Sequence, residues 1–107
     1  MNQLSVMDLK AWLDDATRPA PILLDVREAW EIRTAALAGA LHIPMQEIPA
    51  RACDLEAQRE IVAICHHGAR SMQVAYFLER QGFARVHNLT GGMEAWSRDV
   101  DPSVPRY

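Results

Sequence analysis

The chain has 107 residues, half of them apolar and 23% charged, which is the balance of one globular domain rather than of a disordered chain. Its net charge of −3, without a basic block, gives no electrostatic reason to expect binding to nucleic acid or to a membrane surface. No apolar run approaches the roughly 20 residues that span a bilayer, and the N-terminus does not resemble a signal peptide. We therefore expect a cytoplasmic protein.

The first half of the chain alternates between strand and helix patterns. A short strand is expected near residues 4–6, and Ser5 can cap a helix over residues 7–16, with Asp8 in the capping-box position. The run Pro21-Ile-Leu-Leu-Asp-Val26 is short, branched and without polar alternation, which is typical of a parallel strand covered on both faces. Weaker helical patterns follow at 28–34 and 46–52.

The second half repeats the alternation with stronger signals. The run Glu60-Ile-Val-Ala-Ile-Cys65 predicts a second buried strand. The clearest helix covers residues 70–81, where apolar side chains recur at helical spacing, and Gly82 is expected to end it. A third strand is expected at 84–89 and a short helix at 92–98.

This order of elements predicts an α/β fold with a mainly parallel central sheet flanked by helices. We expect a single domain over residues 1–107, with a core of about 4–98 and a C-terminal tail at 99–107. In such sheets ligands bind beyond the carboxyl ends of the strands. The loops after Val26 and after Ile64 therefore matter most.

The segment Cys65-His-His-Gly-Ala-Arg-Ser71 joins the second buried strand to the clearest helix. Backbone N–H groups of such a loop, and of the first turn of the helix after it, lack intrahelical partners and form a cradle for an anion together with the helix dipole. A thiolate is favoured in such a place. We therefore predict that Cys65 is a reactive thiolate; the alternative is a buried strand-end cysteine that acts as a small apolar residue.

The other residues of the loop fit a cradle. Gly68 lets the chain turn tightly, and Arg70 adds a fixed positive charge. His66 and His67 add charge when protonated; the alternative is that they are ordinary exposed loop histidines. Arg70 has two possible roles, to contact a substrate or to tie its helix to the sheet through a carboxylate such as Glu28.

Asp25 and Arg27 follow the first buried strand, so we expect them near the mouth of the same site. Asp25 can orient backbone groups, and Arg27 can attract anionic donors. The alternative is that they pair with each other, or with Glu28 and Glu31, and close the strand end. Cys53 is interpreted as incidental rather than as a resolving cysteine. The histidines show no ligand-like spacing, so no metal site is expected.

Four segments, in order, resemble the signatures of rhodanese-type sulfurtransferases, and the likeness is greatest to small single-domain bacterial rhodaneses. The run from Cys65 to Arg70 resembles the six-residue active-site loop of that family. The other segments are Leu24-Asp-Val-Arg-Glu28, Ala38-Gly-Ala-Leu-His-Ile-Pro44, and Gly82-Phe83 followed by Asn88-Leu-Thr-Gly-Gly-Met-Glu-Ala-Trp96. The likeness covers roughly residues 4–96.

The resemblance implies a double-displacement reaction through a persulfide. Cys65 would attack the outer sulfur of thiosulfate or another sulfane donor, and the persulfide would pass that sulfur to cyanide or to a thiol acceptor, a protein thiol included. No cofactor is expected. The groups that would bind the persulfide are the loop residues His66, His67, Gly68, Ala69, Arg70 and Ser71.

Two departures from the family pattern affect this interpretation. Ala36 stands where a histidine is expected, so no role of that histidine is carried over. The loop has His66 and His67 where some thiosulfate-using relatives have an Arg-Lys pair, which weakens the case for thiosulfate as the physiological donor.

Two other functions compete with this one. An arsenate reductase or phosphatase of related fold usually has C-x5-R spacing, whereas Cys65 and Arg70 have C-x4-R spacing, which makes a tighter pocket suited to one sulfur atom. A sulfur-relay or carrier module that acts on a protein partner would also keep the cysteine, so the sequence leaves this alternative open.

Overall fold

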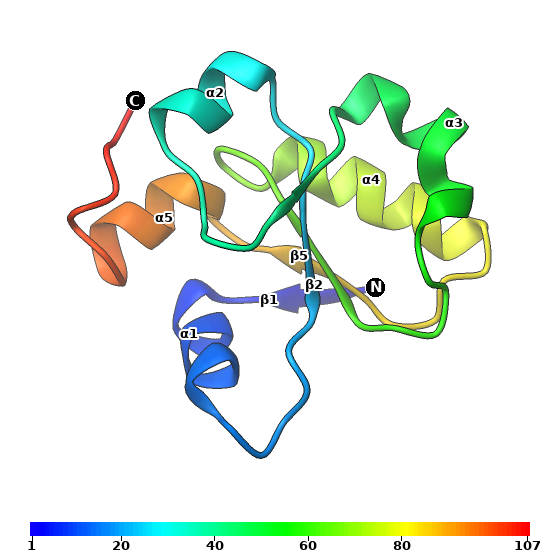
Figure 1. The fold of residues 1–107 in the computed structure, drawn as a ribbon, viewed down its shortest axis with the longest axis horizontal. Coiled ribbons are helices and arrows are strands. Elements are labelled where there is room, and N and C mark those ends of the chain that lie inside the picture. The colour runs from blue at the N-terminus through cyan, green and yellow to red at the C-terminus, as the bar shows by residue number, and fades with distance from the viewer.

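The computed structural model describes residues 1–107 and contains one fully parallel five-stranded sheet with helices on both faces (Figure 1). The strand order is β1-β5-β4-β2-β3. The prediction of a single α/β domain is confirmed. The strands are β1 (Asn2–Leu4), β2 (Ile22–Asp25), β3 (Leu41–His42), β4 (Ile61–Ile64) and β5 (Val86–Leu89), and the helices are α1 (Val6–Asp14), α2 (Ala29–Thr34), α3 (Ile48–Arg51), α4 (Ala69–Arg80) and α5 (Gly92–Asp99).

Most elements lie where the sequence pattern places them. Ser5 caps α1, because its side chain accepts a hydrogen bond from the N–H of Asp8 at 3.1 Å. The first strand lies at residues 2–4, slightly earlier than expected. The weak pattern at 46–52 forms a 3₁₀ turn followed by α3. The two-residue strand β3 was not predicted.

The middle strands bury both faces, which explains their lack of polar alternation. Ile61, Ala63 and Cys65 face a core shared with α3 and α4, whereas Val62 and Ile64 face a second core shared with α1 and α5. Figure 1 shows these two pairs of helices on opposite sides of the sheet. Because successive strand residues point to opposite faces, both sets must be apolar.

From the sequence alone, Trp12, Trp30 and Trp96 are expected to be core or helix-packing residues rather than a binding face. Trp12 and Trp96 are buried, which confirms the interpretation for these two. The prediction is wrong for Trp30, whose side chain is 55% exposed and meets Tyr107 edge-on at the surface. No helix has the length and apolar character needed to cross a membrane.

Candidate active site

Cys65 follows β4 directly and lies at the floor of the loop that leads into α4. It is 1% exposed, and its Cβ side packs in the core shared with α3 and α4. Its Sγ accepts a hydrogen bond from the N–H of Gly68 at 3.1 Å and lies 3.3 Å from Ser71 Oγ. The loop therefore closes over the sulfur.

The carbonyl groups of the loop are held outward by donors from the neighbouring elements. The N–H groups of Met93 and Glu94, in the first turn of α5, donate to the carbonyls of Cys65 (2.9 Å) and His66 (3.0 Å). The side-chain amide of Asn88 donates to the carbonyl of Gly68 at 3.1 Å. In a trans peptide the C=O and the following N–H point in opposite directions. The N–H groups that follow these carbonyls thus point away from α5 and β5.

The start of α4 adds further free donors to this loop. The first helical hydrogen bond at this end runs from Met72 N–H to the carbonyl of Gly68, so the N–H groups before Met72 have no partner within the helix. Gly68 is the N-cap residue, with φ of +103°, a conformation that glycine adopts without strain. Together these groups form a ring of donors around the end of β4, which is suited to a small anion.

Gly92 lets α5 approach the loop closely. Its φ is +56°, and a Cβ at this position would lie 2.3 Å from the carbonyl oxygen of Cys65 and 2.6 Å from that of His66. Any other residue would push the helix and the loop apart. This glycine therefore makes possible the two hydrogen bonds that orient the loop carbonyls.

Arg70 is held by a buried carboxylate. Its guanidinium makes two parallel hydrogen bonds to Glu31, at 2.7 and 2.8 Å, and Glu31 is 3% exposed. The hydrogen bonds from Arg70 are the main reason that the pKa of Glu31 falls to about 2, and Glu31 in turn raises the pKa of Arg70. Of its two possible roles, Arg70 therefore shows the structural one. The prediction that Glu28 is the partner of Arg70 is wrong, because the carboxylate of Glu28 instead accepts a hydrogen bond from Gln46.

Asp25 and Arg27 pair with each other at the carboxyl end of β2. Arg27 is fully buried and donates to both carboxylate oxygens of Asp25, at 2.8 and 2.7 Å, and to the carbonyl of Ala35 at 2.7 Å. Of the two roles left open by the sequence, this geometry favours closing the strand end over attracting anions from solvent.

Tyr107 joins the two ion pairs. Its hydroxyl accepts a hydrogen bond from Arg27 at 2.7 Å and donates one to Glu31 at 2.8 Å. Burial is the main reason that the pKa of Tyr107 rises to about 12. The last residue of the expected tail thus lies against the loop after β2. No local sequence signal could reveal this contact, because its partners are 76 and 80 positions away.

His66 and His67 stack on each other, with ring centroids 4.1 Å apart. His66 also packs against the ring of Tyr107 and has a carboxylate oxygen of Glu94 at 3.9 Å from its Nε2. Burial and the neighbouring His67 nevertheless lower the pKa of His66. At neutral pH His66 is therefore mainly uncharged and adds little to the positive charge of the site.

A short polar network that the sequence did not reveal supports the sulfur from the side of β5. Ser71 is fully buried and donates its hydroxyl to Oδ1 of Asn88, which is itself 3% exposed. The sequence signals for Asn88 were its polar side chain within the strand expected at 84–89 and its place in the family-like segment 88–96. Cys53, by contrast, is exposed, and both cysteines are free thiols.

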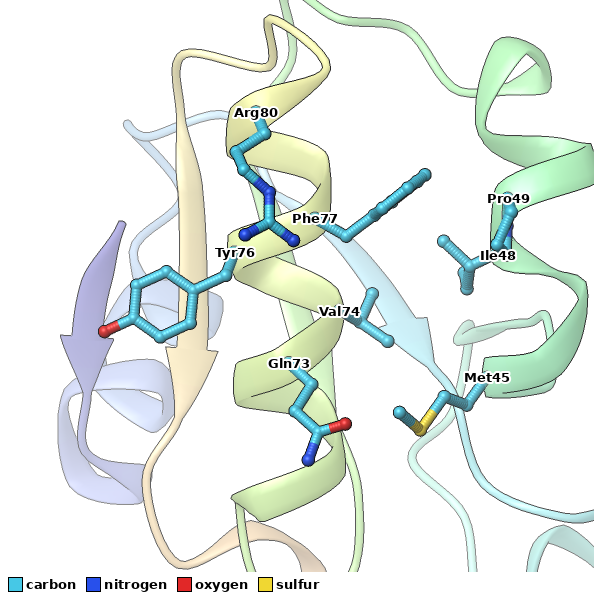
Figure 2. Close-up of a pocket in the computed structure, with 8 residues that line it drawn as sticks. All are labelled: Met45, Ile48, Pro49, Gln73, Val74, Tyr76, Phe77 and Arg80. Atoms are coloured by element: carbon cyan, nitrogen blue, oxygen red, sulfur yellow. The ribbon is translucent and has the colours of Figure 1, made fainter.

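The surface has two hollows in this region. A polar one of about 340 Å³ lies directly beside the loop, where His67, Gly68, Ala69 and Asn88 line it. An apolar groove of about 420 Å³ lies between α4 and the segment that contains α3. Figure 2 shows Val74 and Phe77 of α4 facing Met45 and Ile48 across this groove. No residue of the Cys65–Arg70 loop lines the groove.

The sequence model of the rhodanese-like domain matches residues 5–99. The chain belongs to the rhodanese-like family. A sulfurtransferase of Allochromatium vinosum is 41% identical over 83 residues, which are 78% of each chain. The Rhodanese-like/PpiC domain-containing protein 12 of Arabidopsis thaliana is 44% identical over 89 residues, 79% of this chain but only 30% of that longer protein.

Solved structures agree with this assignment. A rhodanese-like domain protein from Staphylococcus aureus superposes with a TM-score of 0.85 at 27% sequence identity, and the match covers 100% of this chain and 99% of that one. The family and the names of these relatives support sulfur transfer as the general activity.

Proposed function

We propose that this protein is a sulfurtransferase that carries sulfur as a persulfide on Cys65. The observation that carries the proposal is the placement of Sγ at the end of β4, where it accepts a hydrogen bond from Gly68 N–H. The loop above it has its carbonyls turned outward, and its other N–H groups have no hydrogen-bond partner. A persulfide adds one anionic sulfur atom beyond Sγ. Free N–H groups around a small space stabilise that charge without any metal or cofactor.

The reaction proceeds in two displacements. The Cys65 thiolate attacks the outer sulfur of thiosulfate; a sulfur–sulfur bond forms to Cys65, the bond to the sulfite sulfur breaks, and sulfite leaves with that electron pair. In the second step an acceptor thiolate or cyanide attacks the outer sulfur of the persulfide, and the Cys65 thiolate is the leaving group. The loop residues from His66 to Ser71 hold the outer sulfur between the two steps.

The supporting residues act by keeping the loop in shape. Asp25 fixes Arg27, and Tyr107 connects Arg27 to Glu31, which holds Arg70 at the start of α4. Glu31 engages two of the five N–H donors of Arg70 and ties this arginine to α2. The loop from Cys65 to Arg70 is also one residue shorter than the C-x5-R loop that holds a tetrahedral oxyanion. This geometry supports transfer of a single sulfur atom over arsenate reduction or phosphate ester hydrolysis.

Steady-state kinetics with thiosulfate and cyanide test the proposal. Formation of thiocyanate with parallel double-reciprocal lines is expected, because sulfite leaves before cyanide reacts. Cys65→Ser should abolish the activity, whereas Cys53→Ser, a change at the exposed cysteine, should not affect it. If thiosulfate fails but a protein persulfide loads Cys65, the protein is a sulfur carrier. Hydrolysis of an aryl phosphate ester that depends on Cys65 would contradict the proposal.

A further inference from the structure

The side-chain amide of Asn88 has a fixed orientation. Its Nδ2 donates to the carbonyl oxygen of Gly68 at 3.1 Å and to Oε1 of Gln3 at 3.0 Å. A backbone carbonyl can only accept a hydrogen bond, so the nitrogen of Asn88 must face Gly68. Its Oδ1 is therefore the atom that faces Ser71.

This orientation decides which way the hydroxyl of Ser71 points. Oδ1 of an amide can only accept, so Ser71 must donate its single hydroxyl hydrogen to Asn88. What Ser71 Oγ then offers to Cys65 Sγ, 3.3 Å away, is a lone pair. A thiol can donate its hydrogen to that lone pair. A bare thiolate receives no hydrogen bond from Ser71 in this arrangement and keeps only the one from Gly68 N–H.

We propose that Asn88 is a positioning residue that turns Ser71 into a hydrogen-bond acceptor toward Cys65 and so favours an uncharged inner sulfur. The two uncharged forms of that sulfur are the resting thiol and the inner sulfur of the persulfide. The negative charge of the persulfide then sits on the outer sulfur, among the free N–H groups of the loop. The bare thiolate is the state in which the negative charge on Sγ faces the lone pair of Ser71, so this network stabilises it least and keeps it a reactive nucleophile.

The inference rests on the proposed role of Cys65, but it is tested independently of sulfur transfer. The measured quantity is the rate of alkylation of Cys65 by iodoacetamide as a function of pH, in a Cys53→Ser background. The midpoint of that profile reports on protonation of the thiol, whereas access to the sulfur changes the maximal rate. A protein that transfers no sulfur can therefore still show the predicted midpoints.

Asn88→Leu keeps the branched shape of the side chain and removes the amide. The hydroxyl of Ser71 then loses its amide acceptor and is free to donate to the thiolate of Cys65. A hydrogen bond to a charged group is expected to move the alkylation midpoint down by about one pH unit, which is about tenfold more thiolate below the midpoint. Asn88→Asp keeps an acceptor for Ser71 and adds a negative charge, so its midpoint should rise instead.

Two controls separate this role from simple bracing of the loop. Thr90→Val removes another hydrogen bond to Oε1 of Gln3 and should leave the midpoint unchanged. Adding Asn88→Leu to a Ser71→Ala protein should cause no downward shift, because the hydroxyl that would donate is gone. If Asn88→Leu does not fold, as judged by circular dichroism, Asn88→Ala makes the same test.

The proposal is overturned if the folded Asn88→Leu or Asn88→Ala protein has the wild-type midpoint or a higher one. It is also overturned if the downward shift persists without the hydroxyl of Ser71. The geometry predicts a lower alkylation midpoint in Asn88→Leu and a higher one in Asn88→Asp. It also predicts that Asn88→Leu causes no downward shift in the Ser71→Ala background.

Discussion

Glu31→Gln is the substitution that most sharply tests how the loop is held. The carboxylate of Glu31 accepts two hydrogen bonds from Arg70, one from the hydroxyl of Tyr107 and one from the backbone N–H of Glu28. A glutamine at this position presents an NH₂ group to a guanidinium that can only donate. The charge of Arg70 also loses its partner.

The size of the effect follows from the burial of the pair. Removing one partner of a fully buried ion pair costs about 3–5 kcal/mol in the free energy of unfolding. The side chain of Arg70 is 36% exposed, so water compensates for part of the loss. We expect Glu31→Gln to lower the free energy of unfolding by about 2 kcal/mol at pH 7, which corresponds to a Tm lower by roughly 10 °C in a domain of this size.

The pH dependence of this difference provides a second criterion. The pKa of Glu31 is lowered from 4.5 to about 2 in the folded protein, so its stabilising effect is complete above about pH 5 and is lost as the pH falls through about 2. The difference between wild type and Glu31→Gln should therefore shrink to about half near pH 3.3.

Urea denaturation followed by circular dichroism at pH 7 and at pH 3.3 measures both values. Glu56→Gln, a change at an exposed carboxylate, is the control and should alter the free energy of unfolding by less than about 0.5 kcal/mol. Equal stability of wild type and Glu31→Gln at pH 7, or a difference that does not change with pH, would refute the account of Arg70 given above.

Two other substitutions test the packing around the loop. Gly92→Ala should lower the free energy of unfolding by more than about 2 kcal/mol and reduce sulfur loading at least about tenfold, because the added Cβ would collide with backbone oxygens of the loop. The control is Gly39→Ala, which is also at positive φ but has open space around the added Cβ. It should lower the free energy of unfolding by only about 1 kcal/mol and leave sulfur loading unchanged. Tyr107→Phe should lower the free energy of unfolding by about 1–2 kcal/mol, because Arg27 and Glu31 each lose a buried hydrogen-bond partner. Tyr76→Phe, at the surface, should leave it almost unchanged, and urea denaturation measures both values. If a variant and its control lowered the free energy of unfolding equally, the packing described here would be contradicted.

The sequence predicted the parts of this fold that depend on local patterns. Branched apolar runs identified β2 and β4, and helical spacing with a following glycine identified α4. The order of these elements then placed Cys65 at the carboxyl end of a buried parallel strand. β3 was missed because a two-residue edge strand has too few side chains to show any periodicity.

The residues that hold the loop were harder to predict, since they depend on contacts between distant segments. The sequence suggested Glu28 as a partner for Arg70, whereas the way in which α2 begins turns the carboxylate of Glu31 toward it. No sequence pattern near Tyr107 indicates that its hydroxyl contacts Arg27 and Glu31. Asn88 had one indication in the sequence, a polar side chain within a predicted strand, and such a side chain must find hydrogen-bond partners when it is buried.

The central claim is that Cys65 carries sulfur, and the most direct measurement is the intact mass of the protein after incubation with thiosulfate. Wild type and Cys53→Ser should each gain the mass of one sulfur atom, lose it on addition of cyanide, and gain it again with fresh donor. Cys65→Ser should gain none. No added sulfur on wild type with thiosulfate or any other sulfane donor, or added sulfur that persists in Cys65→Ser, would contradict the account.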